Sequence, residues 1–124
     1  MFFMLILIRG LPGSGKSTMA CELAARGYAQ FEADMWFEQR GSFDAALLPE
    51  AHAWCLAQAT AALKNGHDVV VSNTFIKHAE MQPYIDTARR LGQTVEIRCA
   101  TGTWPNRHNV PAEMLTQMTR DFEP

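Results

Sequence analysis

The chain has 124 residues, which fits a single domain, residues 1–124, large enough to bury a core without disulfides or a structural metal. Hydrophobic residues make up 48% of it, and the formal net charge of -2 excludes a strong overall field that would attract nucleic acid or a membrane surface. The three cysteines, Cys21, Cys55 and Cys99, are odd in number and widely spaced, which argues against a disulfide framework or a zinc site and favours a reduced, cytoplasmic setting.

The first predicted element is the apolar run that begins the chain, residues 1–8. It has neither the positive start nor the small-residue cleavage site of a signal peptide, and it is too short to span a bilayer. Because an unbroken apolar run is typical of a parallel strand buried on both faces, residues 2–8 predict a central strand. Residues 16–26 have the composition of a helix closed by a glycine, and residues 28–33 predict a weaker strand that ends at Asp34 and leads into a loop.

The second half of the chain continues the alternation of helices and strands. Its predicted elements are a long alanine-rich helix over residues 48–64, a buried strand over 69–71, a helix over 79–91, a strand over 94–99, a loop over 100–110 and a last short helix that begins at Pro111. Apolar and charged residues alternate over 94–99, which indicates a strand at the sheet edge with one wet face. With right-handed crossovers, the pattern predicts an α/β fold with a four-stranded parallel sheet and helices on both faces.

Residues 10–17 match the phosphate-binding pattern G-x-x-x-x-G-K-[ST] in full. Its glycines let the backbone turn tightly and point N–H groups at a phosphate, beside the N-terminus of the following helix. Lys16 is expected to reach the β- and γ-phosphates, and the Ser17 hydroxyl to bind Mg²⁺. The nucleotide-binding residues predicted here are Leu11, Pro12, Gly13, Ser14, Gly15, Lys16, Ser17 and Thr18, and the cofactors are ATP or another nucleoside triphosphate and Mg²⁺.

Three further features admit two interpretations each. Asp34 follows a strand, where it would accept the proton of an attacking hydroxyl or merely cap a turn. Residues 72–74 (Ser-Asn-Thr) stand where many P-loop proteins carry a magnesium-supporting carboxylate, and they would hold a water or a phosphate or cap the strand end. Arg107 would close over the phosphates as a lid residue or lie solvated in its loop.

These residues together resemble the small P-loop kinases related to phage and bacterial polynucleotide 5′-kinases, an AAA-type ATP-binding domain, over nearly the whole chain. The marks of the resemblance are residues 9–18 (Arg-Gly-Leu-Pro-Gly-Ser-Gly-Lys-Ser-Thr), Asp34, residues 72–74, residues 80–84 (Glu-Met-Gln-Pro-Tyr) and residues 106–111 (Asn-Arg-His-Asn-Val-Pro). The resemblance implies that the P-loop strand lies beside the strand that ends near Thr74, and that a short lid precedes the last helix. It also implies that Asp34 is the general base and that residues 106–111, including Arg107, lie near the nucleotide.

The chain departs from that family pattern at three places. The family often has an arginine a few residues after the catalytic aspartate, whereas the first arginine here is Arg40. It often has a carboxylate in the segment that corresponds to residues 72–75 (Ser-Asn-Thr-Phe), and an arginine in the lid at the position of Pro105. These departures bear on the acceptor site and the transition-state clamp more than on the ATP site.

The leading prediction is a kinase that moves the γ-phosphoryl group of ATP to a hydroxyl, with Lys16 and Asp34 as its catalytic residues. The acceptor would be a DNA or RNA 5′-hydroxyl, a nucleoside, a hydroxymethylated base or a small metabolite, and no membrane partner is expected. Two alternatives stay open: a catalytically weak or inactive nucleotide-binding protein, and a simple nucleoside triphosphatase within a larger assembly.

Overall fold

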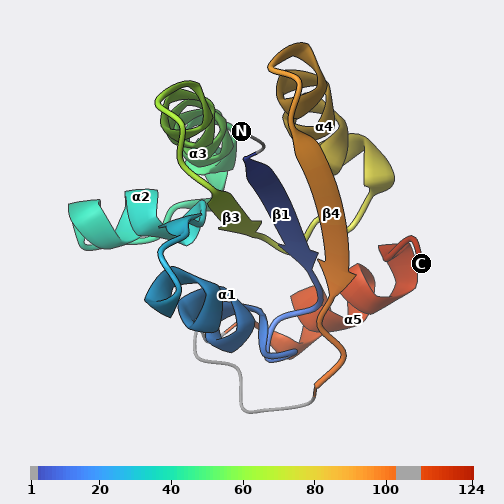
Figure 1. The fold of residues 1–124 in the computed structure, drawn as a ribbon. Coiled ribbons are helices and arrows are strands. Elements are labelled where there is room, and N and C mark those ends of the chain that lie inside the picture. Colours follow the sequence, from blue (N-terminus) through green and yellow to red (C-terminus); the bar gives the residue numbers. More distant parts are fainter. Residues whose placement is uncertain (1–2, 103–109) are drawn as a thin grey trace.

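The computed structural model describes residues 3–102 and 110–124, in which strands and helices alternate along the chain as predicted (Figure 1). The elements are β1 (Met4–Arg9), α1 (Lys16–Ala25), β2 (Ala29–Phe31), α2 (Asp34–Arg40), the short 3-10 helix η1 (Ala45–Leu47), α3 (Leu48–Lys64), β3 (Val69–Ser72), α4 (His78–Arg90), β4 (Thr94–Cys99) and α5 (Ala112–Asp121). The helices α1, α3 and α4 lie within two residues of their predicted bounds, and α5 begins one residue after its predicted start. None of the helices in the described ranges is long and apolar enough to cross a membrane.

The four strands form one parallel sheet in the order β2-β3-β1-β4. Leu5 of β1 lies opposite Val69 of β3 on one side and Val95 of β4 on the other. The predicted four-stranded parallel α/β fold is therefore confirmed, with the P-loop strand in the interior of the sheet and beside β3. The strand β4 lies at the sheet edge, as its alternating sequence predicted.

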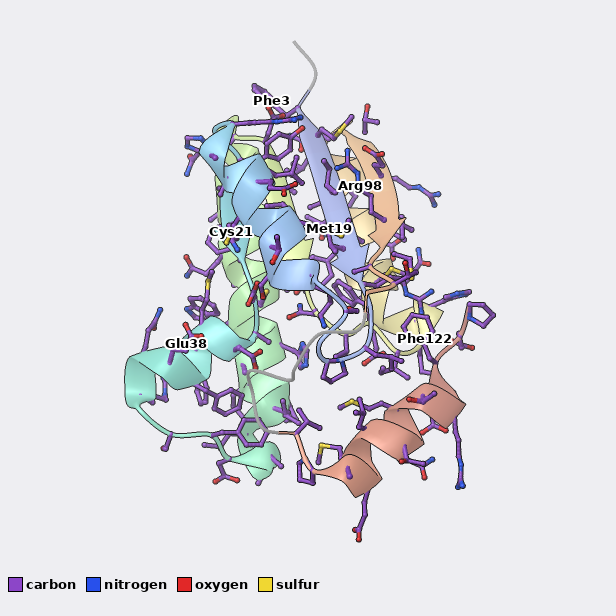
Figure 2. The ribbon with its side chains drawn as sticks, turned by 90° about the horizontal axis from the view of Figure 1, so that it is seen from below. Phe3, Met19, Cys21, Glu38, Arg98 and Phe122 are labelled. Carbon is purple, nitrogen blue, oxygen red and sulfur yellow. The ribbon has the colours of Figure 1, made fainter. Side chains whose placement is uncertain are left out.

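The first strand builds the core because its successive side chains point to opposite faces of the sheet. Leu5 and Leu7 pack against α3 and α4, and Ile6 and Ile8 pack on the other face against α1. All four side chains are fully buried. Since burial of one such side chain contributes about 1.5–3 kcal/mol, this strand anchors both layers of helices. The predicted helices on both faces are confirmed, and Figure 2 shows α1 (light blue) in front of the strands.

The end of β1 is held by a buried arginine. The guanidinium of Arg9 donates to the carbonyl oxygen of Phe75 from Nε (3.1 Å) and Nη2 (2.8 Å). It also lies 4.2 Å from the ring centroid of Phe122, which Figure 2 places beneath the sheet end. A charge as buried as that of Arg9 needs such partners, and the bonds tie the start of the P-loop to the segment that leaves β3.

The segment after β2 differs from its prediction. The strand is shorter than predicted, and the helix α2 begins at Asp34, where a loop was expected. Tertiary packing explains the helix, because Trp36 and Phe37 are buried against Ala51 of α3. Gly41 ends it in the left-handed conformation, with φ 79°. Asp34 thus starts a helix, where a carboxylate is favourable to the helix dipole.

Candidate active site

The P-loop joins the carboxyl end of β1 to the start of α1 and depends on glycine at two kinds of position. Gly15, the residue before α1, has φ 95°, a left-handed conformation that side chains disfavour. Gly10 needs space instead, since a Cβ atom there would lie 2.4 Å from Ser14 Oγ and 2.7 Å from the carbonyl oxygen of Ala100. The conformation that the phosphate motif predicted is therefore the one that this chain adopts.

Hydrogen bonds from neighbouring strand ends brace the loop. The N–H of Gly10 donates to the carbonyl oxygen of Thr74 (3.2 Å), and the N–H of Gly102 donates to that of Ser14 (2.9 Å). These bonds fix the loop at the edge of the sheet where the carboxyl ends of β3 and β4 also lie. The N-terminus of α1 faces the same place and supplies N–H groups suited to an anion.

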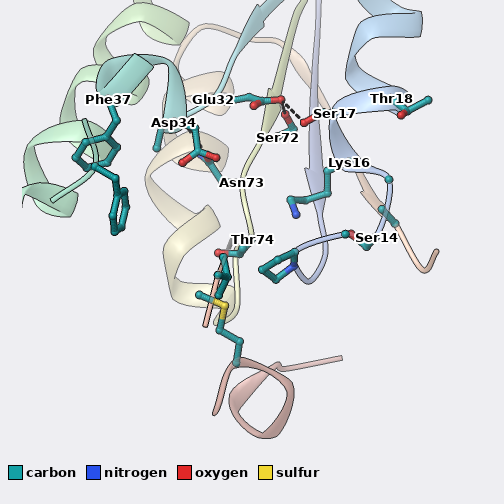
Figure 3. Close-up of a pocket in the computed structure, with 18 of the residues that line it drawn as sticks. Ser14, Lys16, Ser17, Thr18, Glu32, Asp34, Phe37, Ser72, Asn73 and Thr74 are labelled. Atoms are coloured by element: carbon teal, nitrogen blue, oxygen red, sulfur yellow. Dashed lines mark hydrogen bonds between the residues drawn. The ribbon is translucent and has the colours of Figure 1, made fainter. Parts of the chain in front are cut away.

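Lys16 points into the pocket beside this loop (Figure 3). Its Nζ atom donates to the carbonyl oxygen of Leu11 at 3.0 Å. Burial lowers the pKa of the Lys16 ammonium from its ordinary 10.5, and the carboxylates of Glu32 and Asp34 partly offset that effect. The ammonium is therefore held in a partly desolvated place, where a phosphate would improve its environment.

A carboxylate that the sequence analysis missed lies next to the predicted magnesium ligand. Glu32, directly after β2, accepts hydrogen bonds at Oε1 from Ser17 Oγ (3.1 Å) and from Ser72 Oγ (2.7 Å), as Figure 3 shows for Ser17. Its side chain is only 9% exposed. The signal that was available is its place near the end of the predicted strand over residues 28–33, because the carboxyl ends of parallel strands meet at one edge.

Asn73 connects the end of β3 to the loop before Asp34. Its Oδ1 accepts from the N–H of Ala33 (2.9 Å), and its Nδ2 lies 3.8 Å from Cys55 Sγ, to which it donates. Burial raises the pKa of the Cys55 thiol, which keeps it protonated in this position. Of the two interpretations of residues 72–74, Ser72 and Asn73 therefore bind neighbouring protein groups at the strand end.

Asp34 and the P-loop line one pocket of about 1500 Å³. Glu32, Ser72 and Thr74 lie between them in this pocket (Figure 3). The structure thus brings together most of the predicted site, with Pro12, Gly13, Ser14, Gly15, Lys16, Ser17 and Thr18 in the lining. Leu11 contributes its carbonyl oxygen to Lys16. The predicted lid residue Arg107 lies outside the described residues.

Several apolar side chains also line the pocket, and Phe37 lies on the side of Asp34 away from Lys16 (Figure 3). The others are Phe43, Leu48, Met114 and Met118, and the polar residues Glu38, Ser42 and His52 line the same pocket. The rings of Phe37 and Phe43 have centroids 4.8 Å apart. The sequence indicated residues 35–37 as core or as a stacking surface for a base, but it did not indicate the other apolar residues, because they come from α3, α5 and the loop after α2.

Arg40 does not substitute for the family arginine that usually follows the catalytic aspartate. Its guanidinium carbon lies 3.5 Å from the ring centroid of Trp36, and its Nη1 donates to the carbonyl oxygen of Trp36 at 3.2 Å. Arg40 is not among the residues that line the pocket. Within the described ranges, Lys16 is the one lysine or arginine in that lining.

The site suits a magnesium ion that arrives with a nucleotide. Among residues 3–102 and 110–124, no group of three or more His, Cys, Asp or Glu side chains forms a cage for a metal. Mg²⁺ in P-loop sites is held by one serine hydroxyl, phosphate oxygens and retained waters, so it needs no such cage. Ser17, with its hydroxyl bound to a carboxylate, fits that role.

Comparison with known proteins agrees with this geometry. A family model described as an AAA domain matches residues 5–101, which contain the P-loop, Glu32, Asp34 and Asn73. NEDD4-binding protein 2 of Homo sapiens is 31% identical over 133 aligned positions, which cover 96% of this chain. The chain spans only 8% of the length of that protein.

Solved structures show the same fold at low sequence identity. A chain of the Pnkp1/Rnl/Hen1 RNA repair complex superposes with a TM-score of 0.69 at 20% identity, over 94% of this chain and 36% of that chain. The APS kinase CysC of Mycobacterium tuberculosis, in complex with AMPPNP and APS, gives a TM-score of 0.62 at 18% identity, over 94% of this chain and 68% of that chain. The predicted P-loop NTPase fold of the small kinases is thus confirmed.

Proposed function

The chain belongs to the AAA domain family, and on that premise we propose that it is a kinase that transfers the γ-phosphoryl group of ATP, or of another nucleoside triphosphate, to a hydroxyl. One observation carries the proposal: Lys16 and Asp34, a cation and a carboxylate with different tasks in phosphoryl transfer, line the same pocket. A protein that only binds the nucleotide needs the cation, whereas a phosphotransferase needs both the cation and the carboxylate.

The proposed reaction is an in-line displacement at the γ-phosphorus. The acceptor hydroxyl oxygen forms a bond to the γ-phosphorus, the bond from that phosphorus to the β–γ bridging oxygen breaks, and ADP leaves. The hydroxyl proton passes to the carboxylate of Asp34. Lys16 stabilises the negative charge that spreads over the phosphoryl oxygens. Magnesium, held by Ser17 and the phosphates, would neutralise part of the same charge.

The acceptor proposed here carries a flat apolar group close to its reacting hydroxyl. The ring of Phe43 lines the pocket, packs on the buried ring of Phe37 and is 59% exposed, so it offers a stacking surface to a nucleobase. Lys16 is the one lysine or arginine lining the described part of the pocket, so that part offers little binding for a row of acceptor phosphates. These features favour a nucleoside, or a single terminal nucleotide, over a long polynucleotide.

Transfer of label from γ-labelled ATP tests the proposal. Short 5′-hydroxyl DNA and RNA, nucleosides and a panel of hydroxylated metabolites are offered with Mg²⁺ to wild type, Lys16→Ala and Asp34→Asn. We expect label on one acceptor class, loss of ATP binding in Lys16→Ala, and loss of transfer with ATP binding retained in Asp34→Asn.

A different result would favour a nucleotide-binding protein without transfer. The observation behind this second candidate is Arg40, which is stacked on Trp36 and is not part of the pocket lining. If ATP binds through Lys16, no acceptor is labelled, and Asp34→Asn changes nothing, the kinase proposal fails. Release of labelled phosphate to water, without any acceptor, would instead identify a simple triphosphatase.

A further inference from the structure

A buried carboxylate at the edge of the sheet has no task in the reaction proposed above. Glu32 accepts two hydrogen bonds, from Ser17 Oγ and Ser72 Oγ, and both end on Oε1. Its Oε2 accepts no hydrogen bond from residues 3–102 and 110–124, and it is not one of the fully buried polar atoms without a partner, so water can reach it in the nucleotide-free protein. A carboxylate oxygen in that position is available to water that a metal ion retains.

The bond from Ser17 determines which part of that hydroxyl faces the nucleotide site. A serine hydroxyl has one proton and two lone pairs, and here the proton is directed at Glu32. The lone pairs are thereby left for a cation. The carboxylate therefore prepares Ser17 to act as a ligand and adds negative charge beside the place where that cation would bind.

The position of Glu32 also explains how the chain manages without a carboxylate at the end of β3. Strands β2 and β3 are neighbours, with Phe31 opposite Val71, so the next residues, Glu32 and Ser72, lie side by side. The Ser72 hydroxyl is 2.7 Å from Glu32 Oε1. A carboxylate borne by β2 thus reaches the place that a β3 side chain would otherwise occupy.

We propose that Glu32 is the carboxylate of the magnesium site. It orients the Ser17 hydroxyl toward the ion that accompanies the nucleotide, and its Oε2 accepts hydrogen bonds from water that the ion retains. Glu32 is a positioning residue and not the base, which remains Asp34. The inference rests on the nucleotide site of the proposed function but does not require phosphoryl transfer.

Binding of a non-hydrolysable ATP analogue, measured with Mg²⁺ and again with EDTA, tests this role without any acceptor. The informative quantity is the ratio of the two dissociation constants, the magnesium advantage. In Glu32→Gln, which keeps the side-chain volume, we expect that advantage to fall by about 10- to 100-fold, the usual effect of losing a residue that orients a metal ligand. Affinity in EDTA should be equal or higher, because a negative charge near the phosphates is gone.

A matched pair of variants separates this role from a merely structural one. Glu38→Gln neutralises a different carboxylate of the pocket lining, one that is exposed, and should leave the magnesium advantage unchanged. The double variant Glu32→Ser with Ser72→Asp moves the carboxylate to β3 and should restore most of the advantage lost in Glu32→Gln. Melting temperatures establish that each variant is folded.

Three results would overturn the proposal. The first is a magnesium advantage in Glu32→Gln equal to that of wild type. The second is an equal loss of affinity in both buffers, which indicates a structural brace. The third is a folded double variant as poor as Glu32→Gln. None of these results depends on finding an acceptor, so failure of this inference and failure of the kinase proposal are distinguishable.

Discussion

At the scale of single residues, Lys16 shows that a residue of a binding site can lower the stability of the protein before the ligand binds. Burial lowers the pKa of its ammonium, with Glu32 and Asp34 acting in the opposite direction. The charged form therefore destabilises the nucleotide-free fold below the lowered pKa, and this effect disappears as the pH rises through that pKa toward 10.5. Bound phosphate oxygens have the opposite effect on stability, because they favour the charged ammonium of Lys16.

Replacement of Lys16 by methionine tests that account. We expect the nucleotide-free Lys16→Met protein to melt at the same temperature as wild type or a few degrees higher, because an apolar side chain suits the partly desolvated position. The rise in melting temperature that Mg²⁺ and ATP give to wild type should be lost. A variant that melts well below wild type, or that keeps the nucleotide-induced rise, would contradict this account.

The affinity of wild type for the nucleotide should also depend on pH, and the direction of that dependence follows from the pKa of Lys16. Nucleotide phosphates raise the pKa of Lys16, so affinity should be constant below the pKa of the free protein and should fall as the pH rises through it. Because that pKa is lowered, the fall begins below pH 10.5. Dissociation constants measured between about pH 8 and pH 10.5 check the direction, with Lys16→Met as the control that should show no such fall.

The difference between Lys16 and Glu32 shows what the sequence could predict at this scale. Lys16 and Ser17 belong to a motif with fixed spacing, so their roles follow from local pattern. Glu32 acquires its role from Ser72, forty positions later, through a pairing of strands that no local pattern displays. The missing carboxylate after β3 and the position of Glu32 near a strand end were visible in the sequence, but the strand pairing that brings Glu32 to Ser72 was not.

At the scale of elements, the segment from β2 to α2 decides where Asp34 lies. Asn73 holds the N–H of Ala33, the residue before Asp34, and the aromatic side chains of α2 pack on α3. The sequence predicted the strand and missed the helix, because a helix of seven residues is too short to display a clear period and is stabilised by burial against a distant helix. The general place of Asp34 could therefore be predicted, whereas the hydrogen bond and the packing that hold its segment in place could not.

Removal of the Asn73 side chain tests that support. Asn73→Ala leaves the buried N–H of Ala33 without its acceptor, which should reduce the free energy of unfolding by about 1–3 kcal/mol. Transfer should fall more than ATP affinity, since the P-loop does not use this bond. Urea unfolding and both activities are compared with Gln58→Ala, an exposed position inside α3 where a change within about 0.5 kcal/mol is expected. Equal losses in the two variants would contradict the role of Asn73.

At the scale of the whole molecule, the candidate site lies at one edge of the sheet, and the buried side chains that stabilise the fold lie in its centre. The architecture could be predicted because β1 is continuously apolar and β4 alternates, and the two patterns correspond to an interior strand and an edge strand. Residues 103–109, with Arg107, lie outside the described part of the chain, so the predicted lid stays a prediction.

We therefore expect substitutions in the interior strand β1 and in the edge strand β4 to have unequal effects on the free energy of unfolding. Leu5→Ala in β1 should lower the free energy of unfolding by about 2–5 kcal/mol, because the fully buried side chain contacts the α3 and α4 layer. Ile97→Ala in β4, where the side chain is 47% exposed, should cost less than about 1 kcal/mol. Denaturant titrations of both variants provide the comparison, and equal losses would contradict the placement of the core.

The most direct test of the central claim is the single-turnover rate of label transfer from γ-labelled ATP in wild type and Asp34→Asn, with a saturating acceptor. If the pocket performs phosphoryl transfer with Asp34 as base, the rate should fall by about 10²- to 10⁴-fold while the dissociation constant of the magnesium–ATP complex stays the same. Transfer by Asp34→Asn at the wild-type rate would contradict the account.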